Sequence, residues 1–414
     1  MLTIAGSGIN LYSLNELAGK ISFDCFDCII ADINFDNDNN KSLIPANVDF
    51  KFAPFKDVRT FIKDNFINGR KILYIVTGSP LFFSATGIII KYLKDEIPDF
   101  DEQTIEILPS ESSRDYLLKK LKLLENNVTS LSLHGKNIST LDLNRFLLSK
   151  YTFLICDANS LYDVFQYTKY FQDDLVFYIG SKLGSPEEKI EILDLENTIN
   201  DFSPAEFKDL YHPYVLLIEK KYDDWQQISN NQDFVTNAGM LTKTDKRVLT
   251  LQALELKSNL TMWDIGAGSG SVSIDAYKLF KIRSILFEKN KEQCEFIKKN
   301  LAKHKVVGAE LIEGDALKFY KDTPKPDRIF IGGGGTEVLS GIIEIFSQLN
   351  EDGILVANIV VLENLATVVE TLKNTDIKYE IKSIDISHYK KISATINLSI
   401  SEPERTLFQV IMKK

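Results

Sequence analysis

Residues 264–271 read DIGAGSGS, at the point where a predicted strand, Leu260–Ile265, turns into a predicted helix, Val272–Phe280. Glycines at such a turn adopt positive φ without a steric penalty and let a ligand approach the backbone closely. A dinucleotide-binding G-x-G-x-x-G would place its third glycine at position 271, whereas the chain has Ser271 there and a glycine at Gly270. The pattern D-x-G-x-G-x-G is instead typical of sites for S-adenosyl-L-methionine.

Acidic residues end the next two predicted strands. Glu288 closes the strand Ser284–Glu288 and lies 24 residues beyond Asp264, close to the spacing of about 20 at which a carboxylate reaches ribose hydroxyls. Asp315 and the following Ala316 can offer a carboxylate and a backbone N–H to the adenine ring. Successive parallel strands end at the same sheet edge, so we expect these groups to converge. A simple tight connection between strand and helix is the alternative explanation of the glycines.

The rest of the second half alternates between strand-like and helical patterns. Further strands are predicted at Glu310–Ile312, Arg328–Ile331, Ile354–Val361, Glu380–Ile386 and Leu407–Met412. Helices are predicted at Lys243–Leu256, Lys291–His304, Leu339–Leu349 and Glu363–Lys373. Alternating βα units predict a doubly wound, mostly parallel α/β sheet whose ligands lie at the carboxyl ends of its strands. The last two strands can add an antiparallel edge.

The first half also alternates, in two successive sets. Its strands are predicted at Leu2–Ala5, Cys28–Ala31, Lys71–Val76, Thr104–Leu108, Ser130–Leu133, Thr152–Cys156 and Leu175–Ile179, with helices such as Leu81–Leu93 between them. This pattern predicts two α/β subdomains that join near Pro109–Ser113.

Two polar segments interrupt these patterns. Residues 34–40, NFDNDNN, predict a surface loop that buries too little apolar surface to become ordered. A polar stretch at Lys220–Asp233 follows the strand-like Tyr214–Ile218 and predicts an inter-domain linker. We therefore expect a first domain over 1–220, a linker over 221–233 and a second domain over 234–414.

The composition of the chain argues against several classes of function. The 414 residues carry a formal charge of −10, which argues against a nucleic-acid coat or a polybasic membrane surface. Four cysteines in a chain of this length favour a reducing cytoplasm over a disulfide scaffold. The first residues show no signal-peptide pattern, and no apolar run approaches the length of a transmembrane helix. Cys25-x-x-Cys28 has no second cysteine pair, so we expect no metal site.

Further candidates for a substrate pocket lie near the predicted strand ends. The glycine run at 332–335 suggests a pocket wall, and Asn358 can offer a polar group at the same edge, although loop polarity would explain it equally well. Lys243, Lys246 and Arg247 are candidates to bind carboxylates, with a solvated helix face as the alternative.

Both halves carry a series of motifs in a defined order. The second half has GMLTKTDKRVLTLQAL from residue 239, WDIGAGSGSVSID from 263, EGDA from 313, DRIFIGGGG from 327 and LVANIVVLEN from 355. The first half has AGSG from residue 5, GSPLFF from 78, LPSESS from 108, SLHG from 132 and LGSPEEKI from 183. Together these motifs resemble the precorrin-6Y C(5,15)-methyltransferase (decarboxylating) family of cobalamin biosynthesis, and the resemblance covers nearly the whole chain.

This resemblance implies a bilobed tetrapyrrole methylase domain followed by a class I, Rossmann-like methyltransferase domain, each with its own S-adenosyl-L-methionine. It implies methylation of an anionic precorrin at C-5 by the first domain, and at C-15 with decarboxylation of the ring C acetate by the second. It also implies a homo-oligomer. Carried over by motif, the second cofactor site comprises Thr242, Gly266, Ala267, Gly268, Ser269, Gly270, Glu288, Asp315 and Ala316. No catalytic residue is assigned.

The first half departs from the family pattern. Ser79 stands where the family has an aspartate in Gly-Asp-Pro, the Pro-Gly usual after Gly8 is absent, and Lys136 replaces an arginine. Two further hypotheses therefore stay open: a class I methyltransferase acting on RNA or protein, and a degenerate, non-catalytic first domain. His134, in the SLHG motif, is a candidate substrate contact or a structural histidine. The sequence leaves open whether the ring already holds cobalt.

Overall fold

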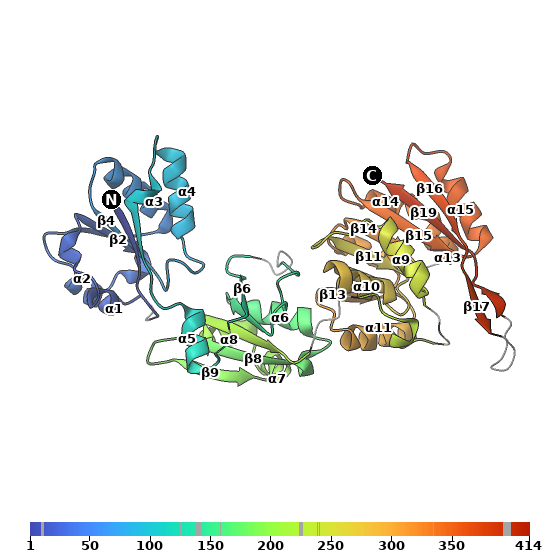
Figure 1. The fold of residues 1–414 in the computed structure, drawn as a ribbon, viewed down its shortest axis with the longest axis horizontal. Helices are drawn as coiled ribbons and strands as arrows, with labels where there is room; N and C mark the ends of the chain where they lie inside the picture. Colours follow the sequence, from blue (N-terminus) through green and yellow to red (C-terminus); the bar gives the residue numbers. More distant parts are fainter. Residues whose placement is uncertain are drawn as a thin grey trace. The chain divides into compact units, whose positions relative to one another are not determined.

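The computed structural model describes residues 1–9, 12–124, 126–136, 142–157, 159–222, 227–237, 239, 241–333, 335–391 and 399–414. The chain forms two compact units (Figure 1). The first comprises Met1–Lys136, Ser149–Leu161 and Val176–Glu219, and the second comprises Asn137–Leu148, Tyr162–Leu175 and Lys220–Lys414. The division into domains at 220 and 234 stays a proposal, because the second unit also takes in two earlier segments.

The first sheet of unit 1 is parallel, with the order β3-β2-β4-β1-β5. Its strands are β1 (Leu2–Gly6), β2 (Cys28–Asp32), β3 (Asp49–Ala53), β4 (Ile72–Val76) and β5 (Ile105–Leu108). The accompanying helices are α1 (Asn15–Ala18), α2 (Asp38–Leu43), α3 (Phe55–Ile67) and α4 (Thr86–Glu96). β3, most of which is exposed, was not predicted from the sequence, although polar and apolar residues alternate from Asp49 to Phe52.

The second sheet of unit 1 is mixed, with the order β6-β7-β10-β8-β9. Its strands are β6 (Val128–Ser132), β7 (Tyr151–Ile155), β8 (Leu175–Ser181), β9 (Lys189–Leu193) and β10 (Tyr214–Lys220). The helices of this part are α5 (Ser113–Lys120), α6 (Ser160–Thr168), α7 (Leu195–Asp201) and α8 (Pro204–Tyr211). The prediction of two successive α/β parts is confirmed.

The prediction of an unordered loop over residues 34–40 is wrong. Asn37 caps the helix α2, and Asn40 is 2% exposed. The Asn40 side chain accepts a hydrogen bond from the Leu14 backbone N–H and donates to the carbonyls of Tyr12 and Phe35. Side-chain amides therefore order this segment by hydrogen bonding, which composition alone does not reveal.

Unit 2 contains a seven-stranded sheet with the order β13-β12-β11-β14-β15-β19-β16. Its strands are β11 (Thr261–Ile265), β12 (Arg283–Glu288), β13 (Ala309–Glu313), β14 (Arg328–Ile331), β15 (Ile354–Ile359), β16 (Tyr379–Ile384) and β19 (Leu407–Lys413). The first five are parallel, whereas β19 runs antiparallel to both β15 and β16. The predicted doubly wound sheet with an antiparallel edge is confirmed.

Helices cover both faces of this sheet. They are α9 (Thr244–Ala253), α10 (Ser271–Phe280), α11 (Lys291–Lys303), α12 (Ala316–Phe319), α13 (Gly335–Ser340), α14 (Ile342–Ser347) and α15 (Leu362–Leu372). Leu251 of α9 and apolar residues of α10 pack in one core cluster, while α13, α14 and α15 contribute to another that contains Trp263. β11 lies between β12 and β14, where the strand order reverses, and ligands of such sheets bind beside this position.

A hairpin that the sequence analysis did not predict precedes β19. It consists of β17 (Ser387–Lys391) and β18 (Ser399–Pro403), whose residues are all exposed. Without a buried face it shows no apolar alternation, which explains the omission. Among the helices built from described residues, none is long and apolar enough to cross a membrane.

Candidate functional site

The glycine-rich turn connects β11 to α10 in a conformation that requires glycine. Gly266 and Gly270 have φ of +70° and +73°, and Gly270 caps the amino end of α10. A Cβ on Gly266 would lie 2.6 Å from the Cα of Gly333. The turn therefore packs backbone against backbone with the loop after β14, and any side chain at Gly266 would push the two loops apart.

Glu288 ties the glycine turn to the neighbouring strand. Its side chain lies at the end of β12, where Oε2 accepts a hydrogen bond from the Gly268 N–H at 2.9 Å and Oε1 accepts one from Asn290 at 2.9 Å. Glu288 is 8% exposed. A carboxylate can accept about four hydrogen bonds, so each oxygen retains capacity for a donor such as a ribose hydroxyl.

Asp315 and Ala316 lie where the sequence places them, at the end of β13. They line a cavity of about 110 Å³ together with Glu288, Gly314 and Gly333. The Asp315 carboxylate also caps α12 by accepting a hydrogen bond from the Leu317 N–H at 3.1 Å. The structure thus brings both predicted strand-end carboxylates to one cavity, and gives Asp315 a structural role as well.

A second cavity, of about 470 Å³, also borders the glycine turn. Its lining is formed by Leu241, Thr242, Lys243, Lys246, Gly266, Ala267, Gly268, Ser269, Ser271, Val272, Phe330, Gly332, Asn358, Val360, Val361, Arg405 and Leu407. The volume falls in the range of small-molecule sites. The hydroxyl of Ser269 is buried without a hydrogen-bond partner among the described residues. Gly334, in the predicted glycine wall, lies outside the described residues, whereas its neighbour Gly332 lines this cavity.

Arg247 does not bind substrate, and both interpretations offered by the sequence are wrong. Its side chain is fully buried and forms an ion pair with Asp275, Nε to Oδ2, at 2.7 Å. The remaining guanidinium nitrogens donate to the carbonyls of Thr242, at 2.7 Å, and Ser229, and to the Asn231 side chain. Helical spacing alone could not show that the segment before α9, which carries Ser229, Asn231 and Thr242, folds back over this face of the helix.

Three cationic residues line the larger cavity: Lys243, Lys246 and Arg405. The Lys246 Nζ lies 2.8 Å from Oε2 of Glu404 and donates to the Arg405 carbonyl at 2.7 Å. Lys243 and Arg405 have no ion pair within the described part of the chain. The cavity therefore combines partly neutralised and unneutralised positive charge, despite the net negative charge of the protein.

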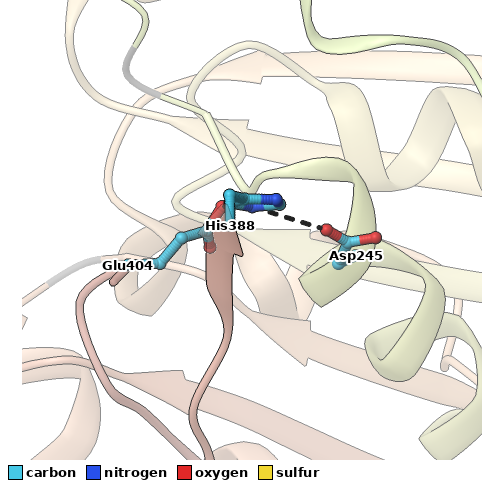
Figure 2. A group of neighbouring side chains, drawn as sticks. All are labelled: Asp245, His388 and Glu404. Carbon is cyan, nitrogen blue, oxygen red and sulfur yellow. Dashed lines mark hydrogen bonds and ion pairs between the residues drawn. The ribbon is translucent and has the colours of Figure 1, made fainter. Parts of the chain in front are cut away.

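Glu404 also belongs to a group with Asp245 and His388 (Figure 2). His388 Nε2 lies 3.2 Å from Oε1 of Glu404 and 3.8 Å from Oδ2 of Asp245. Burial raises the pKa of Glu404, but Lys246 and His388 hold it below its ordinary value. Because Lys246 already neutralises Glu404, and Asp245 and His388 are largely exposed, we interpret the group as an ion-pair network at the base of the β17–β18 hairpin.

Asp264 is the first residue of the glycine motif and is 1% exposed. Burial and, to a smaller extent, the charge of Glu288 raise its pKa to about 7, although the hydrogen bond that Ser273 donates to Oδ2 at 2.7 Å opposes this shift. Oδ1 has no hydrogen-bond partner among the described residues. The carboxyl group therefore lies within the sheet beneath the turn, and the structure gives it no direct place in the lining of either cavity.

The motifs of the first half also meet at strand ends. Gly8 pairs with Gly78 in an isolated bridge, and the Ser110 hydroxyl donates to the Gly78 carbonyl at 2.5 Å. Ser79 is buried and accepts a weak hydrogen bond from the Leu81 N–H at 3.4 Å. His134 is exposed. The loops after β1, β4 and β5 therefore form one cluster, in which Ser79 closes a turn.

Sequence reasoning missed Arg405 and the two valines at 360 and 361. Arg405 precedes β19, which is antiparallel to β15, so its amino end lies at the same sheet edge as the carboxyl ends of the parallel strands. The position of Arg405 could have been predicted from the antiparallel edge strand. A strand that runs antiparallel to its neighbours places its amino end, rather than its carboxyl end, at the edge of the sheet where ligands bind.

Residues 233–412 match the family model of the precorrin methyltransferase domain. A Pyrobaculum aerophilum protein described as a probable cobalt-precorrin-6B C(15)-methyltransferase (decarboxylating) is 32% identical over 178 residues, which are 42% of this chain and 90% of that protein. The precorrin-6Y C(5,15)-methyltransferase (decarboxylating) of a Sinorhizobium species is 25% identical over 315 residues, covering 73% of this chain and 71% of the relative. A crystal structure of the precorrin-6Y C5,15-methyltransferase of Geobacter metallireducens GS-15 shares 32% identity, covers 45% of this chain and 97% of its own, and gives a TM-score of 0.42.

Proposed function

This chain belongs to the precorrin methyltransferase family, and from that premise we propose that it methylates a precorrin at C-5 and C-15 and removes the carboxyl of the ring C acetate. The methyl donor is S-adenosyl-L-methionine. The observation that carries the proposal is the glycine turn at 266–270, tied by Gly268 to Glu288 and bordered by one small and one larger cavity.

The residues of unit 2 suit this cofactor. Glu288 has unused acceptor capacity for the ribose hydroxyls, and Asp315 with Ala316 borders the small cavity where adenine would bind. Thr242, Ala267 and Ser269 border the larger cavity, where the buried Ser269 hydroxyl offers a free polar group. When bound, the sulfonium supplies an electrophilic methyl group.

Methyl transfer to a reduced macrocycle needs positioning more than acid–base chemistry. An enamine-like ring carbon is the nucleophile, and the protein must hold it in line with the methyl group at about 3–3.5 Å. Lys243 and Arg405 are placed to bind the carboxylates of the macrocycle. When the ring C acetate loses carbon dioxide, the C–C bond breaks and its electron pair passes into the conjugated ring, so no further electron sink is required.

We assign C-15 methylation and decarboxylation to unit 2 and C-5 methylation to unit 1. The relative named for C-15 alone is covered over 90% of its length by 178 residues of this chain, close to the length of the matched domain. For unit 1, a second cofactor site is proposed at the loops around Gly8 and Gly78. Ser79 there lacks the charge of the aspartate usual in the family, which keeps a non-catalytic first unit as the competing proposal.

Product mass tests both assignments in the full chain. Wild-type enzyme is expected to add two methyl groups and remove one carboxyl, whereas Gly266→Ala, which disables the unit 2 site, should add one methyl group and retain the carboxyl. No product from Gly266→Ala would support the non-catalytic first unit. Parallel assays with metal-free and cobalt-loaded precorrin identify the substrate form, and activity on tRNA or protein without activity on either precorrin would overturn the proposal.

We also propose that the protein forms a homo-oligomer and acts in the cytoplasm. Four free cysteines, of which three are buried, suit a reducing compartment. Light scattering at several protein concentrations tests the assembly, and a monomer at all of them would refute it.

A further inference from the structure

A buried polar network ends at the wall of the larger cavity. Asn358, near the end of β15, donates from Nδ2 to the Thr250 hydroxyl oxygen on α9 at 2.8 Å. Its Oδ1 accepts a hydrogen bond at 3.2 Å from Nε2 of Gln409, the residue opposite Asn358 on the neighbouring strand β19. Thr250 and Gln409 are 0% and 2% exposed, while Asn358 is half-buried and lines the cavity.

Hydrogen-bond directions in this network fix the orientation of the Asn358 amide. The Thr250 hydroxyl donates its single hydrogen to the Lys246 carbonyl at 2.7 Å, one turn earlier in α9. Its oxygen therefore acts only as an acceptor, from Nδ2 of Asn358 and, at 3.5 Å, from Nε2 of Gln409, and this requires the amide nitrogen of Asn358 on that side. The amide oxygen must then face Gln409, a donor through Nε2. A flipped amide would set Oδ1 against an oxygen with no hydrogen to give.

The stability of the fold does not explain this network, because the network interrupts an apolar core. Val356 on β15 and Ile411 on β19 are buried apolar residues of the same strands. Placing Thr250 and Gln409 among them requires every polar group to find a partner, and an apolar set of the same shape would fold at least as well. The network fixes the amide of Asn358, which lines the cavity, and leaves one N–H and one oxygen lone pair of that amide without a partner among the described residues.

We propose that the free N–H of Asn358 binds a carboxylate oxygen of the macrocycle and so orients the ring against the methyl donor. The inference rests on the proposed function. Lys243 and Arg405 line the same cavity and favour an anionic partner, while Val360 and Val361, each 49% exposed, offer an apolar wall for the ring. Thr250 and Gln409 are positioning residues, since they act only by fixing the amide.

Three variants of the full chain separate a donor role from a structural one. Asn358→Ala removes the N–H, and Asn358→Asp replaces it with a negatively charged acceptor that repels a carboxylate. Gln409→Met keeps the side-chain size but releases one side of the amide. Exposed Asn374→Ala, after α15 and outside the cavity lining, is the matched control.

The measurements are cofactor affinity by calorimetry, precorrin affinity by absorbance titration, and kcat and KM for methyl transfer. A hydrogen bond to a charged group corresponds to about 10- to 100-fold in affinity. We expect Asn358→Ala to raise KM about 10-fold or more, Asn358→Asp to raise it further, and Gln409→Met to raise it less. Cofactor affinity should stay within about twofold in all variants, and Asn374→Ala should match the wild type.

The ranking of the variants by KM tests the inference. Asn358→Asp equal to or better than Asn358→Ala would overturn a donor role toward an anion, and equal losses of cofactor and precorrin binding would show a structural role. If wild-type protein binds no precorrin, the proposed function fails as well. If wild type is active and the Asn358 variants are unchanged, only this inference is overturned.

Discussion

Replacing Arg247 with methionine should destabilise unit 2 and loosen the cofactor site together. The guanidinium holds three separate parts of this unit: Asp275 on α10, the segment at Ser229 and Asn231, and the carbonyl of Thr242 at the larger cavity. Methionine occupies a similar volume without any donor, so packing is largely kept while every one of these contacts is lost.

The magnitude follows from burial. Both side chains of the Arg247–Asp275 pair are 0% exposed, and removing one partner of a buried pair costs about 3–5 kcal/mol because the other charge is left uncompensated. The Ser229 N–H still donates to Asp275, at 3.0 Å, which moderates the loss. We expect a decrease of about 3–4 kcal/mol in the free energy of unfolding of unit 2.

Urea unfolding followed by tryptophan fluorescence measures this change. Trp263 lies in the core of unit 2 at 1% exposure, and the chain has one other tryptophan, so a Trp225→Phe background gives a probe for this unit alone. The matched control is Lys413→Met, which breaks the exposed ion pair with Glu255. That pair should contribute at most about 1 kcal/mol.

A double-mutant cycle with Asp275→Leu then tests the buried pair itself. Replacing both charges by apolar groups removes the uncompensated partner, so the double variant should cost at least about 2 kcal/mol less than the sum of the single ones. Calorimetry should show weakened cofactor binding for Arg247→Met, because Thr242 is released. Additive effects, or a cost for Arg247→Met no larger than that of Lys413→Met, would refute the reasoning.

Three further predictions concern the glycine turn and its surroundings. Gly266→Ala should abolish cofactor binding in unit 2, because its Cβ would lie 2.6 Å from the Cα of Gly333; calorimetry that finds this site intact would contradict the geometry. Glu288→Gln should weaken cofactor binding about 10- to 100-fold through the loss of a charged acceptor, and unchanged affinity would remove Glu288 from the site. The pKa of Asp264 is raised from 3.8 to about 7, so its contribution to stability is fully present below about pH 4 and is lost as the pH rises to 7. Unfolding titrations should therefore show a shallower decline for Asp264→Asn than for wild type across this range, and parallel curves would contradict the raised pKa.

The fold of unit 2 was predictable because its signals are periodic. Its strands are short apolar runs between amphipathic helices, and the antiparallel edge followed from two strands without a helix between them. The β17–β18 hairpin escaped prediction because its strands are exposed and have no apolar face to give a period of two. β3 is short and mostly exposed, but its alternation from Asp49 to Phe52 was a strand signal that the prediction overlooked. Ordering of the segment around Asn40 depends on hydrogen bonds to residues up to 28 positions away, which no local pattern encodes.

The residues of the candidate site also fall into a part that the sequence could predict and a part that it could not. Glu288 and Asp315 could be placed because strand ends converge by topology, and both line the small cavity. The three basic residues of the TKTDKR segment share one composition signal but have different surroundings: Lys243 borders the cavity, Lys246 pairs with Glu404, and Arg247 is buried against Asp275. Only the path of the segment before α9 distinguishes them.

Burial of polar groups in unit 2 is concentrated around the glycine turn, and this has a consequence for its stability. Asp264, the Arg247–Asp275 pair and the Gln409–Asn358 hydrogen bond all lie in or beside the elements that form the larger cavity. Each is a group that an apolar replacement would place in the core at lower cost. Variants selected only for stability should therefore lose polar groups here first, and they should lose ligand affinity with them, because Arg247 holds Thr242 and Gln409 holds Asn358 at the cavity wall.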